Sequence, residues 1–117
     1  MNQNLRKAYD LAIEKALQLM QAGDYYEAHF HLERAHVLGQ RFVVPHVRSH
    51  WLMLRVEIAR RAPGAALGQA VRIYLGALGS AVGVVPVGNT GGSDVSMFAR
   101  MPVPGPVRLL IEGEEGR

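Results

Sequence analysis

Apolar residues recur at helical spacing along most of the chain, and three short breaks containing Gly or Pro interrupt them. Residues three and four positions apart share one face of a helix, so this spacing favours helices over strands. The breaks lie at Gly23-Asp24, at Phe42 to Pro45 and at Ala62 to Gly64. Together they predict an all-α fold, a small bundle of about four helices arranged as helical hairpins.

Four segments are predicted as helices. They cover about Asn4 to Ala22, Tyr25 to Leu38, Val44 to Arg61 and Ala65 to Leu78. Gly23 suits the left-handed position that follows a helix, and Asp24 suits the N-cap of the next one. Glu27 stands three residues after Asp24, which completes a pattern similar to a capping box.

Two apolar stripes predict how these helices pack. Small residues of the second helix align on one face and should let a neighbouring helix approach closely. They are Ala28, Leu32, Ala35 and Gly39. On the third helix the apolar stripe is Val47, Trp51, Leu54 and Ile58. Trp51 is the only tryptophan, and we expect its burial to contribute most to the core.

The composition changes after Ala81. Gly88 to Gly92 is rich in glycine and predicts a loop, and the three prolines between Met97 and Val107 exclude a helix interior there. Because this segment is still apolar, we expect it to lie extended across the bundle as a strap that covers one mouth of a pocket. Residues 1–111 are predicted to form a single helical domain, and residues 112–117 a disordered tail.

Composition and charge exclude several classes of function. The chain of 117 residues has no cysteine, so disulfides, thiol catalysis and cysteine-based zinc sites are excluded. The formal charge of +3 is too small to indicate a nucleic-acid partner without a basic face. Neither a signal peptide nor a membrane-spanning run is visible, which predicts a cytoplasmic protein without a membrane partner.

All five histidines fall between Tyr25 and Arg60, on the second and third predicted helices. Successive residues of a helix are about 100° apart, which places four of the histidines in two stripes that consist mostly of polar side chains. The first holds His29, Glu33, His36 and Gln40, and the second holds His46, His50, Met53 and Glu57. Antiparallel helices joined by a short loop would turn these stripes toward each other and form a pocket lined by imidazole and carboxylate.

This pattern predicts a mononuclear metal site. Its expected ligands are Glu33, His36, His46 and His50, and the expected ion is zinc or iron, with copper as an alternative. A dinuclear site would need about four carboxylates, and the stripes hold only two. The alternative without a metal is an ion pair between Glu33 and a histidine.

Whether the protein is an enzyme stays open at this point. If a metal activates water for a small-molecule substrate, Glu33 or Glu57 would take the proton. Asn89 and Thr90 are the loop residues expected to point into the pocket as binding groups. His29 lies one turn further along the same stripe, where it would support a ligand rather than act as one.

A local resemblance offers a second function. Gly23-Asp24-Tyr25, Glu27-Ala28, Leu32 and Ala35 resemble the middle of a tetratricopeptide repeat. The resemblance implies a helical hairpin, and it favours a protein-interaction module without a metal as the alternative function. The partner would then be another protein or a second copy of the chain.

A wider resemblance covers most of the sequence. It rests on His31 to Gln40, on Pro45-His46 with His50, on Gly88 to Gly92 and on Met101 to Pro104. These motifs resemble an uncharacterised bacterial family of short proteins that is known only as a domain of unknown function. The resemblance implies no activity.

Overall fold

A computed structural model describes residues 1–83, 89–93, 99–103 and 105–115. It contains five helices: α1 (Gln3–Gln21), α2 (Tyr25–Gly39), α3 (Val43–Ala59), α4 (Pro63–Ala81) and α5 (Gly105–Glu115). The described residues hold no strand, so the prediction of an all-α fold is confirmed. Among these helices, none combines the length and the hydropathy that crossing a bilayer requires.

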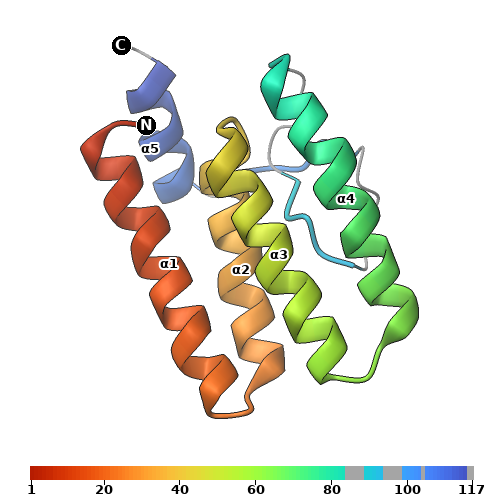
Figure 1. The fold of residues 1–117 in the computed structure, drawn as a ribbon. Helices are drawn as coiled ribbons and strands as arrows, with labels where there is room; N and C mark the ends of the chain where they lie inside the picture. The colour runs from red at the N-terminus through yellow and green to blue at the C-terminus, as the bar shows by residue number, and fades with distance from the viewer. Residues whose placement is uncertain (84–88, 94–98, 104, 116–117) are drawn as a thin grey trace.

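The first four helices pack in the order of the sequence (Figure 1). Helix α1 packs against α2, α2 against α3 and α3 against α4, while α5 lies across one end of α1 and α2. Short turns make each neighbouring pair antiparallel, as expected for helical hairpins. The histidine stripes of α2 and α3 therefore face each other, and α4 closes one side of the seam between them.

The predicted helix start at Asp24 is confirmed. The Asp24 side chain accepts a hydrogen bond from the backbone N–H of Glu27 at 3.3 Å, and this bond satisfies a donor that the first turn leaves unpaired. Gly23 has a φ of +77°, a conformation that side chains with a Cβ rarely adopt. The chain thus reverses between α1 and α2 through local chemistry alone.

The apolar core joins α1, α2 and α3, with one residue from α5. Its buried members are Leu5, Tyr9, Ala12, Ile13, Ala16, Ala28, Leu32, Ala35, Val37, Leu38, Leu52, Met53, Val56 and Val107. The small-residue stripe of α2 is buried as predicted, including Gly39. A Cβ on Gly39 would lie 2.7 Å from the Cβ of Pro45, so the close turn between α2 and α3 requires glycine there.

Tyr9 connects α1 to the first turn of α3 through a hydrogen bond. Its hydroxyl donates a hydrogen bond to the backbone carbonyl of Pro45 at 2.8 Å. Burial raises the pKa of Tyr9 to about 12, so the phenol keeps its proton and remains a donor. This bond fixes the position of Pro45, the residue next to His46.

The predicted apolar face of α3 is wrong. Trp51 is 53% exposed and Ile58 is 62% exposed, so Trp51 does not anchor the core. The buried face of α3 lies about 100° or more away and combines Leu52, Met53 and Val56 with polar side chains. Helix α3 therefore turns its histidine stripe, and not its tryptophan stripe, toward the interior.

The C-terminal region differs from the expected strap and tail. Gly105–Glu115 is a helix. Its proline, Pro106, is compatible with a helix because it stands in the first turn, where a missing N–H breaks no hydrogen bond. Val107 is buried against the core, and residues 112–115 are helical rather than a disordered tail. Residues 89–93 and 99–103 have no regular secondary structure. Gly88, Met97, Pro104 and residues 116–117 lie outside the described residues.

Candidate metal centre

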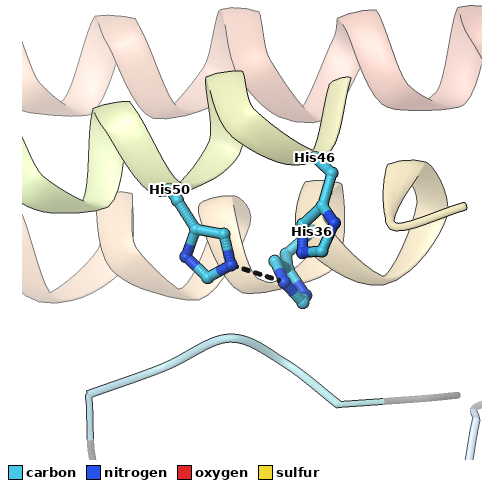
Figure 2. A group of neighbouring side chains, drawn as sticks. All are labelled: His36, His46 and His50. Carbon is cyan, nitrogen blue, oxygen red and sulfur yellow. Dashed lines mark hydrogen bonds between the residues drawn. The ribbon is translucent and has the colours of Figure 1, made fainter. Parts of the chain in front are cut away.

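Three buried histidines meet at the seam between α2 and α3 (Figure 2). His36 comes from α2, and His46 and His50 come from α3. One ring nitrogen of each lies within 4.8 Å of the others, and each residue is less than 5% exposed. The Nε2 atoms of His36 and His50 are 2.9 Å apart. In the part of the chain that the structure describes, this is the one group of three or more metal-ligating side chains.

The partner of His36 fixes its tautomer. Nδ1 of His36 lies 2.8 Å from the backbone carbonyl oxygen of Asn89. A carbonyl oxygen can only accept a hydrogen bond, so Nδ1 of His36 must carry the proton. In the neutral ring, Nε2 of His36 then bears a lone pair.

The partner of His50 leads to the same tautomer. The side-chain amide nitrogen of Gln69 donates to the Gly91 carbonyl at 2.9 Å, which fixes the orientation of the amide. The Oε1 atom of Gln69 therefore faces Nδ1 of His50, at 2.8 Å, and accepts its proton. Nε2 of His50 is again left with a lone pair.

His46 follows the same rule through a hydroxyl. Ser80 Oγ donates its proton to the backbone carbonyl of Gln40 at 2.7 Å. It must then accept from Nδ1 of His46, which lies 2.5 Å away. All three rings thus donate through Nδ1 to a buried acceptor and keep Nε2 free of a proton.

This arrangement leaves two lone pairs facing each other. The Nε2 atoms of His36 and His50 are at hydrogen-bond distance, yet neither has a proton to donate when both rings are neutral. A cation between them removes the repulsion. In a tetrahedral site with bonds of 2.0–2.1 Å, ligand nitrogens lie about 3.3 Å apart, so small shifts of the rings would admit an ion.

The electrostatics of the cluster keep the rings neutral. Burial, with the neighbouring His50 and His46, lowers the pKa of His36 well below its ordinary value of 6.5. Burial lowers the pKa of His46 to about 4, with the His50 charge adding to the shift. Burial, opposed by the hydrogen bond to Gln69 and assisted by the Arg72 guanidinium, lowers the pKa of His50 to about 4. Neutral imidazole is the form that binds metal.

Glycines let two backbone segments pack directly on these rings. A Cβ on Gly91, whose φ is +73°, would lie 2.6 Å from Cδ2 of His36. A Cβ on Gly76 of α4 would lie 3.0 Å from Cε1 of His46. The loop is held in place by Arg72, which donates to the carbonyls of Gly91, at 3.0 Å, and Gly92. Residues 89–93 therefore cover one side of the site (Figure 2), whereas the expected cover was the proline-containing segment between Met97 and Val107.

The predicted carboxylates lie elsewhere along the same seam. Glu33 accepts a hydrogen bond from Nδ1 of His29 at 2.8 Å, and Glu57 accepts one from Ser93 at 3.2 Å. Neither carboxylate belongs to the group formed by the three buried rings. The structure thus brings together His36, His46 and His50 and places Glu33 in a second polar cluster, where His29 is its partner.

The predicted loop residues serve the loop itself. The Asn89 side chain donates to the Ala99 carbonyl at 2.7 Å and accepts from the Gly91 N–H at 2.8 Å. Only the backbone carbonyl of Asn89 reaches His36. The Thr90 hydroxyl accepts from the Gly92 N–H at 3.4 Å.

The contribution of α4 to the site was not predicted. Gln69, Gly76 and Ser80 stand at i, i+7 and i+11, which places them within about 40° on one face of a helix. Two polar residues and a glycine in phase on an otherwise apolar helix were a signal that this face meets polar side chains. Arg72 carried no comparable signal.

Fold and site define a small all-α protein with a buried three-histidine cluster. A family model described as "Protein of unknown function (DUF3703)" matches residues 3–111, and the chain belongs to this family. No curated protein and no solved structure matches the chain. The family description assigns no activity, so the function is argued from the geometry.

Proposed function

We propose that this protein binds one divalent transition-metal ion through His36, His46 and His50. The observation that carries the proposal is the pattern of outer hydrogen bonds: every Nδ1 donates to a buried acceptor, which leaves every Nε2 with a lone pair. Ligating histidines in metalloproteins show this pattern, because the outer partner fixes both the tautomer and the orientation of the ring.

The ligand set favours zinc. Three neutral imidazoles without a thiolate suit borderline divalent ions, and a three-histidine site leaves a fourth position for water. Iron(II) sites more often include a carboxylate. Since Glu33 is bonded to His29 instead, we place zinc ahead of iron, with copper(II) as the alternative that a nitrogen-rich site also accepts.

The geometry supports binding rather than a particular reaction. The two carboxylates expected to move protons, Glu33 and Glu57, do not contact the three rings. Between Glu57 and His50 stand Ser93 and Gln69, linked by a 3.1 Å hydrogen bond. A proton relay through an amide side chain is unfavourable, so we assign neither carboxylate a catalytic role at this centre.

Elemental analysis tests the proposal directly. Protein purified without a histidine tag would be incubated separately with zinc, iron(II) and copper(II), desalted and analysed. We expect about one equivalent of zinc, released by acid when the imidazoles take up protons. Less than about 0.2 equivalents for all three metals would contradict the proposal.

A second candidate function rests on exposed apolar side chains. Those on α3 and α4 include Trp51, Ile58, Leu67, Val71, Tyr74 and Leu78. Such a surface on a small protein is typical of a contact with another protein. This supports the interaction module, including a homodimer, and light scattering on wild type and Tyr74→Ser would test it. A monomer at all concentrations, together with no captured partner, would remove it.

A further inference from the structure

A second polar pocket lies at the other end of the α2–α3 seam. Its volume is about 530 Å³, and both helices, the start of α4 and the 89–93 loop contribute to its walls. Its lining includes Tyr26, His29, Phe30, Glu33, Glu57 and Arg60. The pocket is large enough for a small organic molecule and is separate from the three-histidine centre.

Glu57 provides the main reason to expect a ligand there. It is 1% exposed, and its Oε1 accepts from Ser93 at 3.2 Å and lies 3.5 Å from Arg60 Nη1. Its Oε2 is buried and makes no hydrogen bond within the described residues. Leaving a buried carboxylate oxygen unpaired is unfavourable, so this atom calls for a donor from outside the chain.

His29 offers a second unused atom beside it. Its Nδ1 donates to Glu33 at 2.8 Å, which orients the ring. Its Nε2 is buried, lies 3.3 Å from Oε1 of Glu57 and likewise makes no hydrogen bond within the described part of the chain. When the ring is neutral this nitrogen is an acceptor, and it then lies beside a carboxylate oxygen with no donor between them.

The walls and the charge of the pocket favour a cation. Tyr26 and Phe30 stand one helical turn apart, line the same pocket and are 82% and 61% exposed. Aromatic faces attract cations as well as apolar groups. Two carboxylates, Glu33 and Glu57, outnumber the one arginine of the lining, which disfavours an anion.

We propose that this pocket binds a small organic ammonium cation. The ammonium group would donate to Glu57 Oε2 and His29 Nε2, and its aliphatic part would lie against Tyr26 and Phe30. A metal ion fits less well, because two buried atoms of the described lining are unpaired and zinc sites use three or four protein ligands. The proposal is independent of metal binding at the three histidines.

NMR titration tests the proposal. Uniformly ¹⁵N-labelled protein, kept in EDTA so that no metal contributes, is titrated with n-butylammonium and, separately, with butyrate and 1-butanol. We expect saturable amide shifts for n-butylammonium alone, confined to residues 26–33 and 57–62. Glu57→Gln should weaken binding by about tenfold or more, since a charge-assisted hydrogen bond is lost.

Matched variants separate the pocket from general charge effects. Glu112 on α5 is an exposed glutamate paired with Arg108, and Glu112→Gln should leave the affinity unchanged. Phe30→Ala, at an exposed position, should weaken binding roughly two- to fivefold through the lost cation–π contact. If Glu57→Gln fails to fold, Phe30→Ala and Glu33→Gln decide the outcome.

Three results would overturn the proposal. The first is no saturable shift with n-butylammonium. The second is equal binding of butyrate or 1-butanol. The third is an unchanged affinity in Glu57→Gln, or in both remaining variants. A zinc titration without EDTA adds one further arm: a second equivalent of zinc that Glu57→Gln abolishes would assign the pocket to a metal instead.

Discussion

The two polar clusters on the α2–α3 seam come from the same faces of the two helices. They differ in whether their buried polar atoms have hydrogen-bond partners. At one end His36, His46 and His50 each donate through Nδ1 to a buried acceptor, and one ring nitrogen of each lies within 4.8 Å of the others. At the other end Glu57 and His29 line a pocket, and each keeps one buried atom without a hydrogen-bond partner in the described residues. The first arrangement suits an ion enclosed by protein, and the second suits a ligand that enters from solvent.

The difference arises from α4 and the loop that follows it. Near the three rings, Gln69 and Ser80 of α4 and the Asn89 carbonyl supply an acceptor for every Nδ1. Around Glu57, the neighbouring start of α4 contributes only small residues, Ala62 and Ala65, to the wall. The polar side chains near the three rings are held in place by hydrogen bonds, whereas those around Glu57 lack some of their partners and line a pocket.

Loss of one ring should have the largest effect on this contrast. His36→Ala removes a ligand from the proposed metal centre, and we expect zinc affinity to fall by more than about 100-fold, beyond the 10–100-fold that loss of an outer partner causes. His31→Ala is the matched control, because His31 lies on the same helix outside the cluster. Calorimetric zinc titration of both variants measures the effect, and equal affinities would contradict the assignment.

Acid should destabilise the metal-free protein in a defined window. The pKa of His46 and that of His50 are each lowered from 6.5 to about 4 in the fold. Below pH 6.5 the unfolded chain takes up protons that the folded protein refuses until about pH 4, so stability falls as the pH falls between these values. Each of the two residues should contribute about 1.4 kcal/mol per pH unit to the slope. Urea unfolding across the range measures it, and a flat profile would contradict buried neutral rings.

A smaller loss of zinc affinity should follow from removing an outer partner. Ser80→Ala leaves Nδ1 of His46 without an acceptor, and zinc affinity should fall by about 10- to 100-fold. Ser49 is the matched control, a buried serine that donates to the His46 carbonyl at 2.8 Å and does not touch the ring. Ser49→Ala should change the zinc affinity much less. Equal losses in the two variants would mean that the Ser80 hydroxyl does not orient His46.

The smallest predicted effect concerns the loop that covers the centre. Gly91→Ala would place a Cβ 2.6 Å from His36, at a φ of +73°. Gly83→Ala is the control: Gly83 has a φ of +79° but nothing within 4 Å of the added Cβ. Gly91→Ala should lower the free energy of unfolding by about 1–2 kcal/mol more than Gly83→Ala. Because both glycines have a positive φ, the difference isolates the steric clash between the added Cβ and His36. Equal losses would indicate that the loop does not pack on His36.

Helical periodicity predicted the parts of the fold that depend on local chemistry. The cap at Asp24 and the left-handed Gly23 both follow from side chains within a few residues. The orientation of α3 does not follow from local side chains. Trp51 and His50 lie on different faces of the helix, and the contacts with α2 and α4 determine which face is buried. Helix α5 was not predicted, because three prolines between Met97 and Val107 disfavour a helix interior, but Pro106 lies in the first turn of α5, where proline is tolerated.

The site shows the same division. The stripes on α2 and α3 predicted that imidazoles of the two helices would converge, since both helices and their short connection are local features. They could not decide which stripe members pair, and Glu33 bonds to the adjacent His29 on its own helix rather than joining the three rings. The supporting groups come from α4 and the loop. Gln69, Ser80 and Asn89 lie 19, 34 and 53 residues along the chain from His50, His46 and His36, the rings that they contact.

The most direct test of the central claim is a long-range ¹H–¹⁵N correlation spectrum of histidine-labelled protein, recorded before and after one equivalent of zinc. We predict that His36, His46 and His50 carry their protons on Nδ1 in the zinc-loaded protein and that zinc shifts only their Nε2 resonances. Protons on Nε2 of these rings, or a spectrum that zinc does not change, would contradict the account.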